Sequence, residues 1–208
     1  MAYEHILLEY FDAHAMITIN REKSLNALNL ASLDEIKDAL KKCARNEDVK
    51  VVVFTGAGNK AFIAGADILE LHNKSMIDML EPDGYQELLT YIDEFEKPTI
   101  AKINGYTFGG GCELAMACDI RVASEQSRFA LPELNLSILP AAGGTQRLAK
   151  LVGLGNALYM ILTSKQFTAK EAKEIGLINE VVTADALDST VDNIIENLAS
   201  KSSIALKL

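Results

Sequence analysis

Short β-branched runs that alternate with helical patterns constrain the fold of this chain most. The runs are VKVVVFT at 49–55, TIAKI at 99–103 and DIRVAS at 119–124. Runs with little polar alternation are typical of strands that are buried on both faces. Amphipathic helices are predicted over 30–45 and 84–95, and the pattern is mostly helical from Gly143 onward. Because buried strands alternate with helices, the sequence predicts an α/β fold.

The remaining apolar patterns extend this fold toward both ends of the chain. Apolar alternation predicts strands at 4–10 and 15–19, and a further strand is predicted at 178–183. The last clear helix has one apolar face, formed by Leu187, Val191, Ile194, Ile195 and Leu198. No internal repeat, linker or low-complexity stretch interrupts the 208 residues, which is the length of about one domain.

The composition excludes several classes of function. A formal net charge of −9 argues against a surface for nucleic acid or anionic membrane. The longest runs without charge lie between Glu133 and Arg147 and between Lys150 and Lys165. Both are shorter than the roughly 18 residues that a membrane-spanning helix needs. The first residues have the pattern of neither a secretory signal nor an Arg-rich transit peptide.

Cysteine usage indicates a reducing compartment. Cys43, Cys112 and Cys118 have no metal-ligand spacing, and three cysteines do not form a disulfide framework. We interpret them as small buried apolar residues. The sequence therefore predicts a cytoplasmic protein without a metal site.

Two glutamates stand in apolar surroundings beside Gly-rich backbone. Glu113 lies in GYTFGGGCELAMACD, in the first turn of a predicted helix whose following residues are apolar on every side. Glu133 is the only charged residue between Arg128 and Arg147. A buried carboxylate requires a partner or a chemical role. Two such groups in an apolar site can divide general-acid and general-base work between them.

Two Gly-containing loops precede predicted helices and offer backbone N–H groups. The first is AFIAGADILEL, which enters a helix at Asp67, and the second contains the three glycines at 109–111. Glycine lets the backbone approach a ligand closely, and the first N–H groups of a helix have no intrahelical acceptor. Loops 63–67 and 109–111 can therefore supply one donor each to an oxyanion.

Several motifs, taken together and in order, resemble the crotonase superfamily, the enoyl-CoA hydratase/isomerase family. The matching segments are KSLNAL (23–28), AFIAGADI (61–68), INGYTFGGGCELAMACDIRVA (103–123), FALPELNLSILPAAGGTQRL (129–148) and TSKQFTAKEAKEIGLINEVV (163–182). The resemblance implies a crotonase-like spiral of ββα units with a catalytic core over 1–190. It also implies that 191–208 is the start of a C-terminal helical trimerisation region.

The activity implied by the resemblance is reversible syn hydration of a trans-2-enoyl-CoA to a 3-hydroxyacyl-CoA. The N–H groups of Ala66 and Gly110 would hold the thioester oxygen as it becomes an enolate oxygen. Glu133 would handle the proton at Cα, and Glu113 would activate the water that adds at Cβ. Fixed backbone dipoles in a dry site can stabilise enolate charge without a metal.

The resemblance also assigns residues to the coenzyme A portion of the substrate. Lys23 and Leu25 match the segment along the phosphates and adenine, and the backbone of 63–65 matches the stretch that receives the adenine. The implied contacts are Lys23, Leu25, Ala64, Gly65, Asp67 and Ile68. No separate cofactor is implied, since coenzyme A is part of the substrate. The implied assembly is a homotrimer or a dimer of trimers.

Other functions stay open from the sequence. A Δ3-Δ2-enoyl-CoA isomerase, or another enzyme of acyl-CoA enolate chemistry, is the nearest alternative. Isomerases of the family commonly keep the Glu133-type carboxylate and lose the Glu113-type one, so the presence of both favours hydration. A non-catalytic RNA-binding relative is disfavoured by the net charge of −9. Residues 69–85, which line the acyl pocket in the family, are polar and predict no acyl chain length.

Three features depart from the family pattern. Ala141 replaces a glycine whose backbone approaches the catalytic water, and we expect it to narrow that water site. Leu69 replaces a lysine of many members, so one contact to the coenzyme A phosphates is expected to be missing. Near the C-terminus, Ser202 and Ser203 predict a helix start. We therefore expect the C-terminal region to be incomplete, with residues 200–208 poorly ordered or packed against another subunit.

Overall fold

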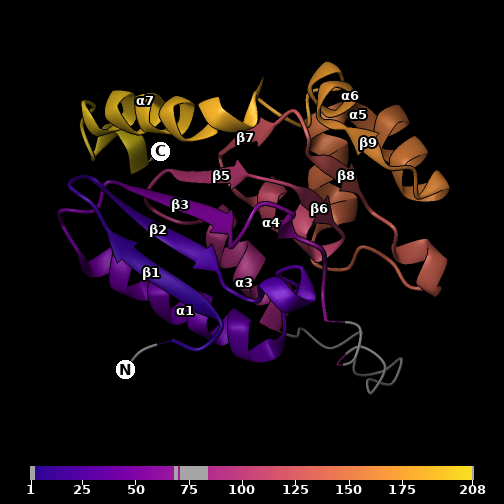
Figure 1. Cartoon of the computed structure of the whole chain (residues 1–208), viewed down its shortest axis with the longest axis horizontal. Coiled ribbons are helices and arrows are strands. Elements are labelled where there is room, and N and C mark those ends of the chain that lie inside the picture. The colour runs from indigo at the N-terminus through magenta and orange to yellow at the C-terminus, as the bar shows by residue number, and fades with distance from the viewer. Residues whose placement is uncertain (1–2, 68–69, 71–83, 208) are drawn as a thin grey trace.

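The computed structural model describes residues 3–67, 70 and 84–207, which form two sheets flanked by helices (Figure 1). The larger sheet has the strand order β1-β2-β3-β5-β7-β10, and the smaller sheet has the order β4-β6-β8-β9. The strands are β1 (Ile6–Tyr10), β2 (His14–Ile19), β3 (Val51–Gly56), β4 (Ala61–Ile63), β5 (Thr99–Ile103), β6 (Tyr106–Phe108), β7 (Ile120–Ser124), β8 (Arg128–Ala130), β9 (Phe167–Thr168) and β10 (Glu180–Val182). The α-helices are α1 (Leu30–Arg45), α3 (Gly84–Asp93), α4 (Gly110–Ala117), α5 (Gly144–Thr163), α6 (Ala169–Glu174) and α7 (Leu187–Ala199). Short 3-10 turns are η1 (Glu22–Ser24), η2 (Glu133–Leu136), η3 (Ala184–Ala186) and η4 (Ala205–Lys207).

Successive ββα units build a spiral. In β3-β4-α3, β5-β6-α4 and β7-β8-α5, the first strand joins the larger sheet and the second joins the smaller one. The strands β3, β5 and β7 are parallel neighbours, and so are β4, β6 and β8. Because parallel strands end at the same edge of a sheet, the segments that follow β4, β6 and β8 come together. The predicted catalytic residues lie on these segments.

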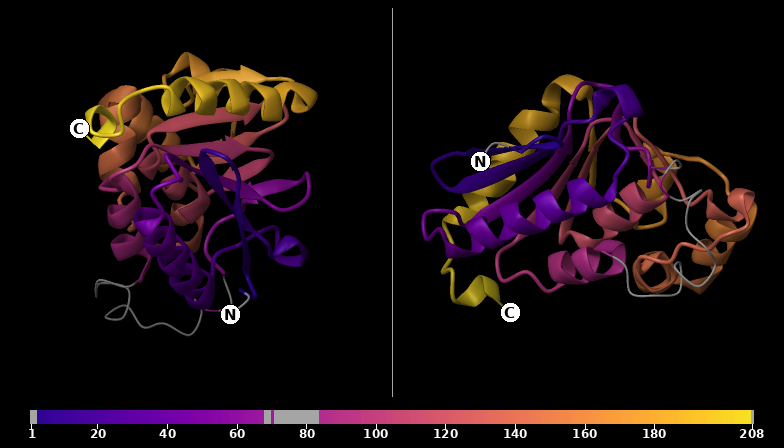
Figure 2. Two further views of the ribbon diagram at one scale, coloured as in Figure 1. Left: turned by 90° about the vertical axis from the view of Figure 1, so that its left-hand side faces the viewer. Right: turned by 90° about the horizontal axis from the view of Figure 1, so that it is seen from below.

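The centre of the larger sheet, formed by β3, β5 and β7, is buried on both faces, as its apolar strands predict. Helix α7 lies across one face, and α1 and α3 lie on the other (Figure 2). On the α7 side, Val51 and Val53 of β3 pack with Val191 and Ile195. The alternate residue of the same strand, Val52, belongs to the main core on the opposite side. The sheet is therefore a rigid support for the loops at its edge.

The predicted elements agree with the structure wherever the pattern is long. The helix over 30–45 and the strand over 99–103 are confirmed at both ends, and the other predicted strands begin or end within three residues of the observed ones. The predicted helix start at Ser202 leads only to η4 within the described residues. The boundary between 190 and 191 falls inside α7, and the division into two regions stays a prediction.

The described residues also bear on the membrane, cysteine and metal predictions. None of the described helices is both long and apolar enough to cross a membrane. Cys43, Cys112 and Cys118 are free and buried, as the sequence predicts. Within the described residues, no group of three or more His, Cys, Asp or Glu side chains could hold a metal ion.

Candidate active site

Glu113 lies on a helix that is buried along its whole length. Helix α4 begins after Gly109, whose φ of 50° favours glycine, and every residue of the helix is buried. A Cβ at Gly111 would overlap the carbonyl oxygen of Ile63 in β4, so only glycine fits there. The glycines thus let α4 pack closely against β4, and they place Glu113 in the interior with 4% of its surface exposed.

The Glu113 carboxylate is held by backbone at the start of α5. Its Oε1 accepts a hydrogen bond of 2.8 Å from the N–H of Gly144. Burial raises the pKa of Glu113 to about 7, and the charge of Glu133 acts in the same direction. The hydrogen bond from the Gly144 N–H, the nearby backbone of Ala142 and the charge of Arg147 oppose this rise. The net effect is a carboxyl group that takes up a proton more readily than an exposed glutamate does.

Glu133 supplies a second buried carboxyl group, from the segment between β8 and α5. It is the first residue of η2 and is 9% exposed. A Cβ at Gly109 would lie 3.1 Å from Oε1 of Glu133, so this oxygen faces the start of α4. Its Oε2 is buried and has no hydrogen-bond partner among the residues described. Burial raises the pKa of Glu133 to about 7. A buried oxygen of this kind is expected to bind water or a ligand.

The two buried carboxyl groups lie near enough for the charge of one to act on the other. The charge of Glu133 acts on Glu113, and the charges of both raise the pKa of the buried Cys112 thiol after the larger effect of burial. The structure therefore brings together two glutamates that are 20 positions apart in the sequence. Such a pair can hold one proton between its members and can offer an acid and a base to the same ligand.

The loops that carry the predicted oxyanion donors lie side by side. A Cβ at Gly110 would lie 3.7 Å from the backbone nitrogen of Ala66. The Leu28 N–H donates a hydrogen bond of 2.8 Å to the Gly65 carbonyl, and the Leu28 carbonyl accepts one of 2.6 Å from the Asp67 N–H. These two hydrogen bonds form a parallel bridge between Leu28 and Ala66. Since alternate residues of an extended chain point in opposite directions, the Ala66 N–H points away from Leu28. We find no backbone acceptor for the Ala66 or Gly110 N–H in the described parts of the chain.

Two segments predicted to contact coenzyme A run along each other. The Ala64 N–H donates to the Leu25 carbonyl at 3.1 Å, and the bridge to Gly65 continues this pairing. Lys23 and Leu25 are exposed, and Leu25 has a φ of 50° that turns the chain toward β4. The structure thus brings Leu25 next to Ala64 and Leu28 next to Gly65, and Lys23 lies two residues before Leu25.

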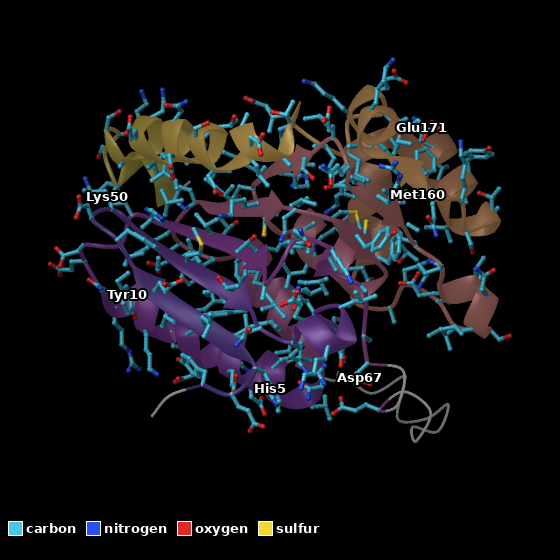
Figure 3. The ribbon with its side chains drawn as sticks, in the orientation of Figure 1. His5, Tyr10, Lys50, Asp67, Met160 and Glu171 are labelled. Atoms are coloured by element: carbon cyan, nitrogen blue, oxygen red, sulfur yellow. The ribbon has the colours of Figure 1, made fainter. Side chains whose placement is uncertain are left out.

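The last predicted coenzyme A contacts differ in what the structure shows. The Asp67 carboxylate, labelled in Figure 3, accepts a hydrogen bond of 2.9 Å from Arg21. This ion pair is largely buried, so the Asp67 side chain ties its loop to the segment before η1. Ile68 and Leu69 lie outside the described residues.

Some groups that hold the site were missed by sequence reasoning. The Arg147 guanidinium donates a hydrogen bond to the Ala142 carbonyl. The Tyr85 hydroxyl donates a hydrogen bond of 2.6 Å to the Leu28 carbonyl, beside the oxyanion loops. The glycine pair before Arg147 is a sequence signal for close approach, which could have pointed to this loop. Ala141 is exposed, and its effect on the catalytic water stays a prediction.

Comparisons with known proteins agree on one family. The family model described as enoyl-CoA hydratase/isomerase matches residues 12–208. The crotonyl-CoA hydratase of Syntrophomonas wolfei is 44% identical over 209 residues, which are 100% of this chain and 80% of that protein. The short-chain-enoyl-CoA hydratase of Clostridium acetobutylicum is 42% identical with the same two shares.

A solved structure extends the similarity to three dimensions. The crystal structure of an enoyl-CoA hydratase from Bacillus anthracis matches with a TM-score of 0.93 and 38% identity. The match covers 98% of this chain and 80% of that one. The predicted crotonase-like α/β fold is thereby confirmed.

Proposed function

The chain belongs to the enoyl-CoA hydratase/isomerase family, and we propose that Glu113 and Glu133 act on one water in the hydration of an enoyl-CoA. Hydration by a hydro-lyase is the activity that its named relatives support. The observation that carries the proposed mechanism is the buried Glu133 Oε2, which has no partner among the described residues and belongs to a carboxyl group whose charge acts on Glu113. We propose that the water binds between the two carboxyl groups.

The two carboxyl groups fit the two proton transfers of hydration. Glu113 accepts a proton from the water as its oxygen bonds to Cβ, and Glu133 donates a proton to Cα. One water thereby adds across the double bond on a single face. Glu113 has then gained a proton and Glu133 has lost one, and proton exchange with solvent water restores the pair. Raised pKa values near 7 suit both groups to these transfers at neutral pH.

The oxyanion is proposed to lie between the N–H groups of Ala66 and Gly110. The adjacency of the two loops and the direction of the Ala66 N–H support this assignment. Gly110 is the first residue of α4, so its N–H also belongs to the positive end of a buried helix. Donors fixed in this way stabilise the enolate oxygen as charge develops on it, because they require no reorganisation.

The coenzyme A portion is proposed to lie along the rim formed by Lys23, Leu25, Ala64 and Gly65. The backbone pairing of Leu25 with Ala64 and the exposure of the Lys23 and Leu25 side chains support the assignment. Asp67 would act by holding the loop through Arg21. The absence of a separate cofactor and the cytoplasmic location stay predictions.

We expect the purified protein to hydrate crotonyl-CoA, because relatives with full coverage of this chain are named crotonyl-CoA and short-chain-enoyl-CoA hydratase. The loss of ultraviolet absorbance of the conjugated thioester measures the reaction, and a series of longer enoyl chains measures the preference. An isomerase would instead convert a 3-enoyl-CoA into a 2-enoyl-CoA without consuming water. Isomerisation without hydration would therefore contradict the proposed function.

A homotrimer or a dimer of trimers is proposed for the assembly. Helix α5 exposes a stripe of leucines at successive turns, Leu154, Leu158 and Leu162, of which Leu154 and Leu162 are 65% and 66% exposed. An apolar stripe of this kind favours burial against another surface. We expect light scattering to give a mass that is a multiple of three chains of 22.6 kDa, and Leu158→Glu to lower it. A wild-type monomer would contradict this assembly.

A further inference from the structure

Arg147 of α5 connects a neighbouring helix to the loop that holds Glu113. Its Nη1 donates to the Ala142 carbonyl at 2.9 Å, and its Nη2 donates to the Leu89 carbonyl in α3 at 3.1 Å. The side chain is 12% exposed, and Asp93 of α3 pairs with it at 3.4 Å. One planar guanidinium therefore bridges α3 and the loop before α5.

The loop is shaped to receive this guanidinium. Gly143 has a φ of 98°, and a Cβ at this position would overlap Nη1 of Arg147. The Arg147 N–H also donates to the Gly143 carbonyl at 2.9 Å, which fixes the first turn of α5. A residue with a side chain at 143 would displace the guanidinium from the loop.

Ala142 lies between Arg147 and Glu113. Its carbonyl accepts a hydrogen bond from Arg147, and its backbone is near enough to the Glu113 carboxylate to lower the pKa of that group. Gly144, two residues later, gives the carboxylate its 2.8 Å hydrogen bond. A shift of this loop would move the donor that holds Glu113.

We propose that Arg147 is a positioning residue for Glu113. Its planar fork fixes the backbone of 142–144, so that the Gly144 N–H holds the Glu113 carboxylate in place. A lysine could keep the charge, but a single ammonium group does not reproduce the geometry of the fork. This inference rests on the proposed function, in which Glu113 activates the water.

The charge of Arg147 gives the inference a second, electrostatic consequence. The groups that act on Glu113 are Glu133 of η2 and Arg147 of α5, with Cys112 adjacent in α4 and Asp93 of α3 paired to Arg147. Arg147 lowers the pKa of Glu113, so its loss should raise that pKa. A smaller fraction of Glu113 would then be ionised at a given pH, and the acidic limb of kcat/KM would move to higher pH.

The test is Arg147→Met in the full chain, which removes the charge and the fork but keeps an unbranched apolar side chain. We expect kcat for crotonyl-CoA to fall by about 10-fold or more, while KM changes by less than about three-fold. Independently, carbon NMR of labelled glutamate, assigned with Glu113→Gln, should show the Glu113 titration moved upward by about one pH unit. The NMR measurement requires no substrate.

Two further variants make the test decisive. Lys150→Met is the matched control, because it makes the same kind of substitution at an exposed cation of α5, and it should leave kcat and the titration unchanged. Arg147→Lys should keep the titration near its wild-type position but recover only part of kcat. It also serves if Arg147→Met does not fold. An unmoved titration in folded Arg147→Met, or wild-type kcat in Arg147→Lys, would overturn the proposal. A moved titration in a chain that does not hydrate crotonyl-CoA would reject the hydratase function alone.

Discussion

Glu113→Gln and Glu133→Gln are each expected to lower the turnover of crotonyl-CoA hydration by roughly 10²–10⁴. The first variant removes the base that activates water, and the second removes the acid that protonates Cα. The fold should survive in both, since glutamine keeps the size of glutamate and retains an acceptor oxygen for the Gly144 N–H. Steady-state kinetics measure the loss, and circular dichroism checks the fold.

Glu196→Gln, on the exposed face of α7, is the matched control for these variants and should keep wild-type kcat. The charge of Glu133 raises the pKa of Glu113, so the residual activity of Glu133→Gln should have its acidic limb at lower pH than the wild type. Near-normal hydration by either active-site variant would remove that residue from the mechanism.

The fold could be predicted where the apolar pattern was long enough to show its period. Helix α1 buries Leu33, Ile36 and Leu40 on one stripe, and the capping box of Asn29 and Ser32 fixes its start. By contrast, β6, β8 and β9 are two or three residues long and show no period of their own. Their pairing is decided by the neighbouring strands, which a local pattern does not reveal.

The candidate site could be predicted in part because its two carboxylates stand in apolar stretches of the sequence. Glu113 and Glu133 are charges inside apolar runs, and burial of 96% and 91% shows that the sequence context was informative. That they approach each other follows from the parallel order of β6 and β8, which is tertiary information. The resemblance to a family supplied this pairing, whereas periodicity alone did not.

The groups that support the carboxylates are harder to recognise from the sequence. Ala142 acts through its backbone carbonyl, which accepts from Arg147, and an alanine in AAGG gives no sign of this hydrogen bond. The carbonyl that a guanidinium reaches depends on the relative position of α3 and α5. In the sequence, Arg147 is therefore recognised only as the charged residue that ends an uncharged run. Backbone groups and long cationic side chains are therefore the parts of such a site that are hardest to predict from a single sequence.

Loss of the Gly110 N–H is expected to lower kcat by about 10²–10³, the usual cost of one oxyanion donor. Gly110→Pro deletes this N–H. Proline is tolerated at the first position of a helix, which Gly110 occupies in α4, and the preceding Gly109 has no Cβ for the ring to meet. A Cβ at Gly110 would find the Ala66 nitrogen at 3.7 Å as its nearest neighbour, so there is room for one added carbon.

Gly110→Ala is the control that separates the donor from the space around it. Alanine adds the same Cβ but keeps the N–H, so it should retain most of the activity that the proline variant loses. KM should change little in either variant, because the donor strengthens its hold mainly as charge develops on the thioester oxygen. Equal losses in the two variants would mean that the added carbon, and not the missing N–H, blocks the reaction. The proposed oxyanion site between Ala66 and Gly110 would then be wrong.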